Sequence, residues 1–139
     1  MENYVIRIDI PEVEEYLALR QICGLSARDK EASKTGLANS IYSVIIRNKT
    51  DEKLIGMGRI IGDGGTAYQI VDIAVHPKEQ GKGLAKAIME LLMKYVHDEI
   101  NPQAYVNLIA DRPADKLYEQ FGFCLLYTSP SPRDRSLSR

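Results

Sequence analysis

The sequence is poor in cysteine and has no long apolar run, and both absences limit what the protein can be. Its two cysteines, Cys23 and Cys124, can form one disulfide at most. Neither has metal-ligand spacing to the two histidines, His76 and His97, so we expect no metal site. No stretch of eighteen apolar residues and no charged-then-apolar leader occurs, so we expect a cytoplasmic chain with no membrane partner.

An excess of charge of one sign is also missing. Eighteen basic residues face nineteen acidic ones, which argues against a protein that coats nucleic acid or an anionic membrane. Hydrophobic residues make up 45% of the chain and charged residues 27%, as in ordinary globular domains. A length of 139 residues fits one compact domain, and neither an internal repeat nor a linker is visible.

Periodicity divides most of the chain into strands and helices. Alternating or β-rich apolar runs predict strands over residues 4–10, 40–48, 53–62, 67–76 and 104–110. Apolar residues at helical spacing predict helices over residues 11–23, 28–37, 83–99 and 114–121. This order of elements predicts one α/β domain with a mostly antiparallel sheet.

The last sixteen residues, 124–139, differ from the rest in character. After Tyr127 the chain reads TSPSPRDRSLSR and has no apolar period, which suits a disordered tail. The run CLLYTSPSPRD also resembles a translated sequencing adapter, and we favour this interpretation. We therefore expect a natural domain over residues 1–123, cut after Phe123, and a non-native tail over residues 124–139.

The segment over residues 71–96 carries the clearest chemical signal. A strand enters a turn with Gly81 and Gly83, and the turn opens a long helix that has no Ser, Thr, Asp or Asn as a cap. Free amides and the helix dipole make such a start an anion site, to which Lys82 and Lys86 add positive charge. A diphosphate suits this site. Neither the dinucleotide fingerprint nor the P-loop pattern fits, because Lys86 stands at the third glycine position of the former.

Two motifs resemble landmarks of the GNAT superfamily of acetyl-CoA-dependent N-acetyltransferases. The run Gln80-Gly81-Lys82-Gly83-Leu84-Ala85 matches the pattern Q/R-x-x-G-x-G/A, and Val75-His76-Pro77 precedes it. Residues 111–123 read D-x-x-A-x-x-L-Y-x-x-F-G-F, which is similar to the second landmark of the family. The resemblance covers residues 1–123.

The resemblance implies a three-layer α/β (α+β) fold whose mixed, mostly antiparallel sheet is flanked by helices. The final strands are expected to be missing, because residues 125–127 could begin one strand and nothing supplies the second. The resemblance also implies a site for acetyl-CoA. Its pyrophosphate would rest on the backbone of Gln80, Gly81, Lys82, Gly83, Leu84, Ala85 and Lys86. Its pantetheine arm would pair with the strand at Ile73, Ala74 and Val75, which family members splay open with a bulge.

Direct attack of an amine on the thioester needs a base, a donor to the carbonyl oxygen and an acid for the departing thiolate. By resemblance, Tyr118 is the acid and lies near the sulfur, although a core tyrosine is the simpler alternative. A backbone N–H near Val75 would be the donor. Asp72 is a carboxylate in an apolar strand, so it either serves the reaction, by accepting the amine's proton through water or by binding the cationic acceptor, or is half of a buried ion pair. His76 ranks below Asp72 as a candidate base. Gln69 stands where some members carry a catalytic glutamate, which leaves deprotonation through water open.

Three further expectations concern the affinity for acetyl-CoA, the acceptor amine and the alternative functions. Asp111 replaces the usual Asn and can only accept hydrogen bonds when ionised, so cofactor binding should be weaker; it could also cap the next helix. Residues 24–39 should form the acceptor wall, and a small primary amine is the expected acceptor. A non-catalytic acyl-CoA-binding module and an inactive truncated chimera are the alternatives, and a homodimer is left open.

Overall fold

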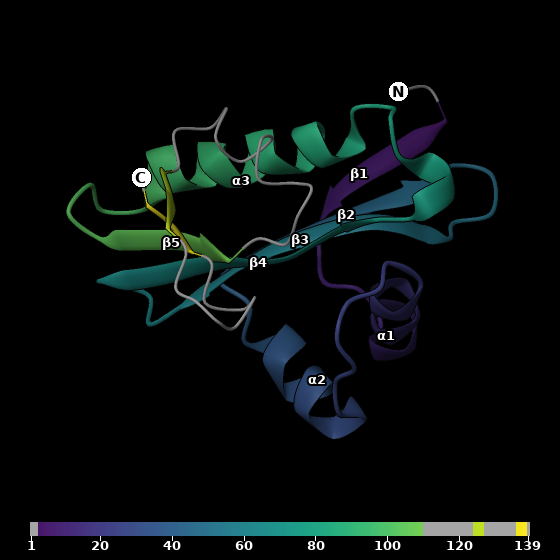
Figure 1. Cartoon of the computed structure of the whole chain (residues 1–139), viewed down its shortest axis with the longest axis horizontal. Coiled ribbons are helices and arrows are strands. Elements are labelled where there is room, and N and C mark those ends of the chain that lie inside the picture. Colours follow the sequence, from purple (N-terminus) through teal and green to yellow (C-terminus); the bar gives the residue numbers. More distant parts are fainter. Residues whose placement is uncertain (1–2, 110–123, 127–135, 139) are drawn as a thin grey trace.

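The computed structural model describes residues 3–109, 124–126 and 136–138 (Figure 1). The strands in this part of the chain are β1 (Tyr4–Ile8), β2 (Tyr42–Asn48), β3 (Leu54–Gly62), β4 (Ala67–Val75), β5 (Tyr105–Ile109), β6 (Cys124–Leu126) and β7 (Ser136–Ser138). The helices are α1 (Val13–Ile22), α2 (Lys30–Ala38), α3 (Leu84–Glu99) and the short 3-10 helix η1 (Pro77–Glu79). None of the described helices is long and apolar enough to cross a membrane.

All strands belong to one sheet in the order β1-β2-β3-β4-β5-β7-β6. Neighbouring strands are antiparallel except β4 and β5, which run parallel from the Ala67–Tyr105 pair to the Ile70–Leu108 pair. The long helix α3 lies between these two strands in the sequence, as a parallel crossover requires. The predicted mixed, mostly antiparallel sheet is therefore confirmed.

The helices cover the sheet on both sides, which gives three layers (Figure 1). Helix α3 lies over one face, and α1 and α2 lie under the other. Strand β2 serves both cores, because Val44 and Ile46 pack toward the cluster around α3 while Ile45 joins the cluster around α1. Successive side chains of a strand point to opposite faces, so this continuous apolar run is buried on both sides of the sheet.

Glycines in β3 allow α3 to lie close to the sheet. A Cβ atom at Gly58 would stand 2.6 Å from Cγ2 of Ile88 and 3.1 Å from Cδ1 of Leu92, and both of these side chains are fully buried. A Cβ at Gly56 would lie 3.3 Å from Ile88 Cδ1. Side chains at these positions would push the helix away from the strands.

The helix starts follow local capping. The expectation of a helix from Pro11 was two residues early, because Glu12 is the N-cap of α1 and forms a capping box with Glu15. In α2 the Asp29 side chain accepts a hydrogen bond from the Ala32 amide, at 2.9 Å. The predicted helix over residues 114–121 lies outside the described residues.

The C-terminal strands differ from expectation. Residues 136–138, from the segment predicted to be a tail, form β7 and insert between β5 and β6. The expectation that nothing supplies a second strand after residue 127 was therefore wrong for these three residues. Strand pairing uses backbone donors and acceptors, which every non-proline residue carries whatever its side-chain pattern.

Candidate active site

The turn before α3 presents backbone to the surface. Gly81 and Gly83 have φ of +81° and +80°, a conformation that side chains disfavour. Gly83 is the N-cap of α3, and no side chain caps the helix. A Cβ at either glycine would meet nothing within 4 Å, so the space beside the turn is open.

The amides of this turn fit an anion. Among the described residues, no hydrogen bond is donated by the backbone amides of residues 80–86, and the first amide to find an acceptor is that of Ala87, which donates to Gly83. These seven donors lead into the positive end of a 16-residue helix, where unpaired amides and the helix dipole both favour a negative charge. A pyrophosphate fits this donor set, which the sequence predicted for Gln80, Gly81, Lys82, Gly83, Leu84, Ala85 and Lys86.

The two lysines of the turn are not equivalent. Lys82 Nζ lies 2.8 Å from Glu79 Oε2 and 3.1 Å from the Tyr4 hydroxyl, so its charge already has a partner. Tyr4 also donates to Glu79, at 2.5 Å, which ties β1 to the turn. Lys86 is exposed on the first turn of α3. The positive charge expected from Lys82 is thus largely neutralised within the protein.

Strand β4 carries the bulge that the resemblance implied. Met57 and Arg59, two residues apart on β3, face Ala74 and Val71, three residues apart on β4, so β4 holds one extra residue. Asp72 within this bulge has φ of +60°. Aspartate tolerates the left-handed region better than most residues. The predicted bulge is confirmed.

Beyond the bulge, the side of β4 turned away from β3 has no strand partner among the described residues. Pairing with β5 ends at Ile70, among the described residues. The His76 amide donates to Ile55, so alternation directs the N–H and C=O of Val75 away from β3. The Val75 carbonyl accepts from Cys23 Sγ at 3.3 Å and from Gln80 Nε2 at 3.1 Å. Ile73, Ala74 and Val75 pack their side chains into the two cores, which leaves their backbone as the part able to pair with a ligand.

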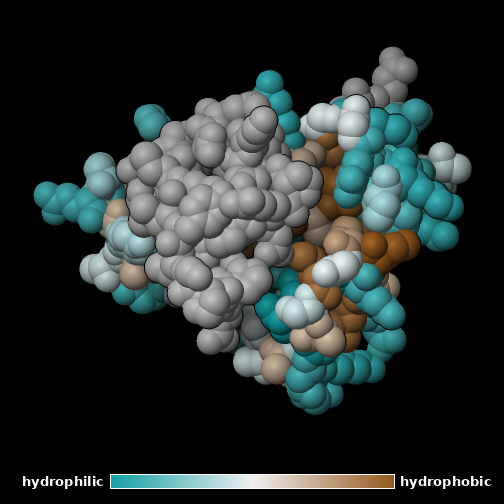
Figure 2. Space-filling view, viewed as in Figure 1, coloured by the Kyte–Doolittle hydropathy of each residue, from teal (hydrophilic) through white to brown (hydrophobic). Residues whose placement is uncertain are grey.

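Apolar surface lies between the layers on this side of the molecule. Figure 2 shows it between the upper layer, where α3 begins, and the lower layer, which contains α1. An extended ligand arm with apolar segments suits such a surface.

The Asp72 side chain is the centre of a buried ion-pair cluster. Its Oδ1 accepts from Arg20 Nη1 at 2.5 Å, and its Oδ2 accepts from the Tyr16 hydroxyl at 2.7 Å and from Arg59 Nε at 2.8 Å. The side chains of Asp72, Arg20 and Arg59 are only 6%, 6% and 11% exposed. Of the two alternatives that the sequence left open for Asp72, the geometry matches the buried ion pair.

The partners of Asp72 were missed by the sequence analysis. Arg59 lies inside the apolar strand β3, the same anomaly that singled out Asp72 in β4. Arg20 lies on the buried face of α1, four residues after Tyr16. A search for opposite charges at buried positions would have paired these residues, but it could not have shown that both arginines share one carboxylate.

The other expected participants are placed as follows. Gln69 is half-buried on β4 beside Asn107 of β5. His76 is half-buried, and its Nδ1 accepts from the Lys78 amide at 3.1 Å, which caps η1. Tyr118 and Asp111 lie outside the described residues, so their expected roles stay predictions. No group of three potential metal ligands occurs within the described part of the chain.

Comparison with known proteins gives a consistent result. The sequence profile of the acetyltransferase (GNAT) family matches residues 12–123. A crystal structure of a probable acetyltransferase of unknown function from meticillin-resistant Staphylococcus aureus is 48% identical, covers 91% of this chain and 92% of its own, and superposes with a TM-score of 0.82.

More distant relatives agree. An uncharacterized N-acetyltransferase, ycf52, from Porphyra purpurea is 32% identical over 111 residues, which are 76% of this chain and 62% of the relative's length. A GNAT family N-acetyltransferase (YhbS) from Escherichia coli, solved in complex with CoA, shares the fold with a TM-score of 0.68 at 17% identity, over 98% of this chain and 81% of its own. The profile match, the staphylococcal structure and the open bulged strand beside an uncapped helix start lead to one conclusion: the chain belongs to the GNAT family of N-acetyltransferases.

Proposed function

We propose that the chain is an acetyl-CoA-dependent N-acetyltransferase that acetylates a primary amine of a small molecule by direct attack in a ternary complex. The observation that supports this most is the junction of β4 and α3. One open strand end, bulged at Asp72, leads directly into seven amides that have no acceptor among the described residues.

The backbone of this junction fits CoA in two parts. The amides of residues 80–86 would hold the pyrophosphate, and the outward N–H of Val75 would pair with the pantetheine arm as an added strand does. Acetyl-CoA supplies an acetyl group activated as a thioester. The amine nitrogen forms a bond to its carbonyl carbon, the carbon–sulfur bond breaks, and the thiolate takes a proton.

We assign three roles to residues of this chain. Tyr118 protonates the leaving thiolate, and a backbone N–H at or near Val75 donates to the carbonyl oxygen as charge develops on it. Asp72 acts as a positioning residue, because both of its oxygens already accept hydrogen bonds from buried donors. Water then carries the amine proton away, since Gln69 has no basic group.

For the organisation of the chain, we propose that residues 1–123 form the acetyltransferase domain and that residues 124–139 are a non-native tail. The end of the family match at residue 123 supports this boundary. The pairing of residues 136–138 with β5 weighs against it. A chain that ends at residue 123 tests whether residues 124–139 belong to the domain. If β7 contributes to stability, its loss should lower the midpoint of urea unfolding; an unchanged midpoint would support the tail as non-native.

The cofactor site is tested by calorimetric titration of acetyl-CoA into the chain and into two glycine variants. Gly83→Glu places a negative charge where the pyrophosphate would lie. Gly64→Glu is the matched control, because Gly64 also has positive φ (+84°) and open space but lies in the turn between β3 and β4. Both variants carry the same backbone strain, and circular dichroism checks that both are folded.

We expect saturable binding to the original chain and to Gly64→Glu, and at least a hundredfold loss in Gly83→Glu. Thiol release with a panel of amines then separates an enzyme from a module that binds acyl-CoA without turnover. If both glutamate variants bind acetyl-CoA as the original chain does, the α3 start is not the cofactor site and the proposal fails.

A further inference from the structure

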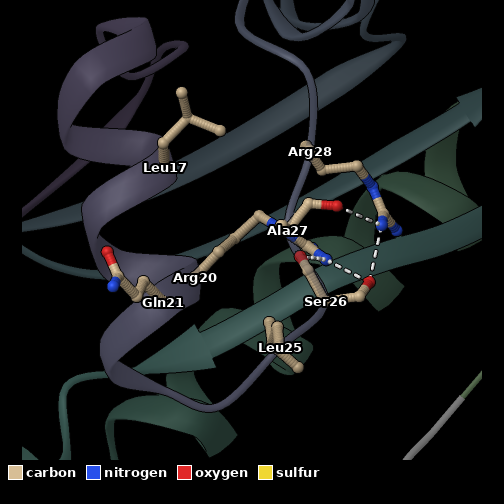
Figure 3. Close-up of a pocket in the computed structure, with 7 residues that line it drawn as sticks. All are labelled: Leu17, Arg20, Gln21, Leu25, Ser26, Ala27 and Arg28. Carbon is tan, nitrogen blue, oxygen red and sulfur yellow. Dashed lines mark hydrogen bonds between the residues drawn. The ribbon is translucent and has the colours of Figure 1, made fainter.

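A pocket of about 330 Å³ lies between the C-terminal half of α1 and the loop that follows it (Figure 3). This loop belongs to the segment that the sequence predicted as the acceptor wall. Three of the lining residues are apolar, namely Leu17, Leu25 and Ala27. The other four are Arg20, Gln21, Ser26 and Arg28, and none of the seven is acidic.

Two guanidinium groups converge on Ser26 in this pocket (Figure 3). Arg20 Nη2 donates to the Ser26 carbonyl at 2.9 Å and to Ser26 Oγ at 3.2 Å. Arg28 Nη1 donates to the same Oγ at 2.6 Å and makes a long contact of 3.4 Å with the Ala27 carbonyl. Arg28 is exposed, and among the described residues its guanidinium contacts just its own loop, so it can turn to a ligand at little cost.

Among the described residues, the buried cluster behind the pocket holds two guanidinium groups and only one carboxylate. Arg20 and Arg59 share the single carboxylate of Asp72, and Tyr16 brings no charge because burial and the nearby Asp72 raise the pKa of its hydroxyl. Arg20 is only 5% exposed, and its Nε is buried without a hydrogen-bond partner. Uncompensated buried charge is costly, so a monoanion nearby would be stabilised.

We propose that this pocket binds the carboxylate of the acceptor, so that the substrate is an amine that carries a carboxylate, such as an amino acid. The inference rests on the proposed acetyltransferase function. Arg28 offers a two-pronged donor to the carboxylate, as arginine does in bidentate pairs, and Arg20 supplies positive charge from below. The apolar residues on the rim accommodate the carbon chain.

The charges around this pocket suit one carboxylate better than an anion with two or more negative charges. One carboxylate matches the single excess charge of the Asp72 cluster, whereas the decarboxylated or amidated amine leaves it unbalanced. Hydrogen bonds to a charged group contribute about 1.5–3 kcal/mol, or roughly ten- to a hundredfold in affinity. The pocket therefore favours acids over their neutral counterparts.

The test uses the proteinogenic amino acids and their α-carboxamides, which have nearly the same shape but lack the negative charge; because the amide's amine is less basic, each acid-to-amide ratio is compared between variants at one pH. Acetyl transfer to each pair is measured by thiol release, and binding of each pair without acetyl-CoA is measured by ligand-observed NMR. Arg28→Gln is the test variant. Arg7→Gln is the matched control, because Arg7 is also exposed and contacts Glu52 at 3.4 Å, away from the pocket.

We expect at least one acid to be favoured tenfold or more over its amide by the original chain and by Arg7→Gln. In Arg28→Gln this preference should fall to threefold or less, with the amide little affected. Arg28→Lys should keep part of the preference. Amines acetylated without regard to the carboxylate, or acid and amide weakened equally by Arg28→Gln, would overturn the inference and leave the acetyltransferase function intact.

The NMR binding measurements separate the carboxylate pocket from the acetyltransferase function. Acids that bind through Arg28 in a chain that acetylates none of the amines would support the pocket and refute the acetyltransferase function. Absence of any difference in binding between acids and amides would refute the pocket whatever the chain does with acetyl-CoA.

Discussion

Replacement of Asp72 by asparagine removes one negative charge from the centre of the sheet and changes little else. Asparagine has the same shape and tolerates the left-handed backbone, so φ of +60° is kept without added strain. Arg20 and Arg59 would then lie buried with no counter-charge among the described residues, and the new amide group would point one donor at another. Loss of one partner of a buried pair costs about 3–5 kcal/mol. For a domain of this size, that loss lowers the melting temperature by roughly 10–20 °C.

Urea unfolding followed by circular dichroism measures this loss, and the m-value shows whether the folded state stays compact. Asp98→Asn is the control, since Asp98 is an exposed carboxylate that pairs with Lys94 on the surface of α3, and little change is expected there. A second variant that adds Arg59→Gln to Asp72→Asn should recover part of the stability, because only one unpaired cation remains.

The same variant separates the two roles considered for Asp72. A positioning role predicts lost stability with acetyl transfer reduced mainly through the acceptor KM. If the free energy of unfolding of Asp72→Asn lies within about 1 kcal/mol of that of the original chain while its kcat falls to near zero, the ion-pair reasoning is refuted and Asp72 is the base.

Three further predictions, two on substitutions and one on alkylation, test separate parts of the structure. Gly58→Ala should destabilise the fold by about 1–3 kcal/mol, because its Cβ would lie 2.6 Å from a buried methyl group of Ile88; an unchanged urea midpoint would contradict the close packing of α3. Glu15→Gln should cost about 1 kcal/mol at pH 7 and almost nothing near pH 2. The hydrogen bonds from Arg47 lower the pKa of Glu15 from 4.5, so this pair stabilises the fold above that pH and stops doing so as pH falls through the lowered value. Equal costs at both pH values would refute this. Burial raises the pKa of the Cys23 thiol, so at pH 8 iodoacetamide should alkylate it more slowly than a free cysteine, as peptide mass spectrometry would show; faster alkylation would contradict this burial.

The sequence was most informative where structure follows from local pattern. The β-rich apolar runs over residues 40–48 and 53–62 located strands to within two residues. The start of α3 was predicted because its flanking glycines and its lack of a cap are both readable from the letters. In these segments, neighbours in the chain supply the decisive interactions.

The remaining features depend on partners far apart in the chain. Arg20 and Asp72 are 52 residues apart and Arg59 and Asp72 are 13 apart, so no local pattern reports their ion pairs. Asp72 adopts positive φ because the bulge requires it, although glycine is the usual choice at such positions. The hydrogen bond from Lys82 to the Tyr4 hydroxyl joins the turn before α3 to β1, 78 residues away in the chain, and was equally hidden.

The attachment of α1 and α2 to the sheet sets a condition for exchanging segments between relatives. Tyr16 and Arg20 bind Asp72 from α1, while Arg59 donates to the Gly36 carbonyl and to Ser40 Oγ at the end of α2. A chimera that takes residues 13–40 from another family member would replace the acceptor side and leave Asp72 and Arg59 behind in the sheet. Such a graft must bring a hydroxyl and a guanidinium to the same places, so compatible donors can be chosen by these few positions rather than by overall identity.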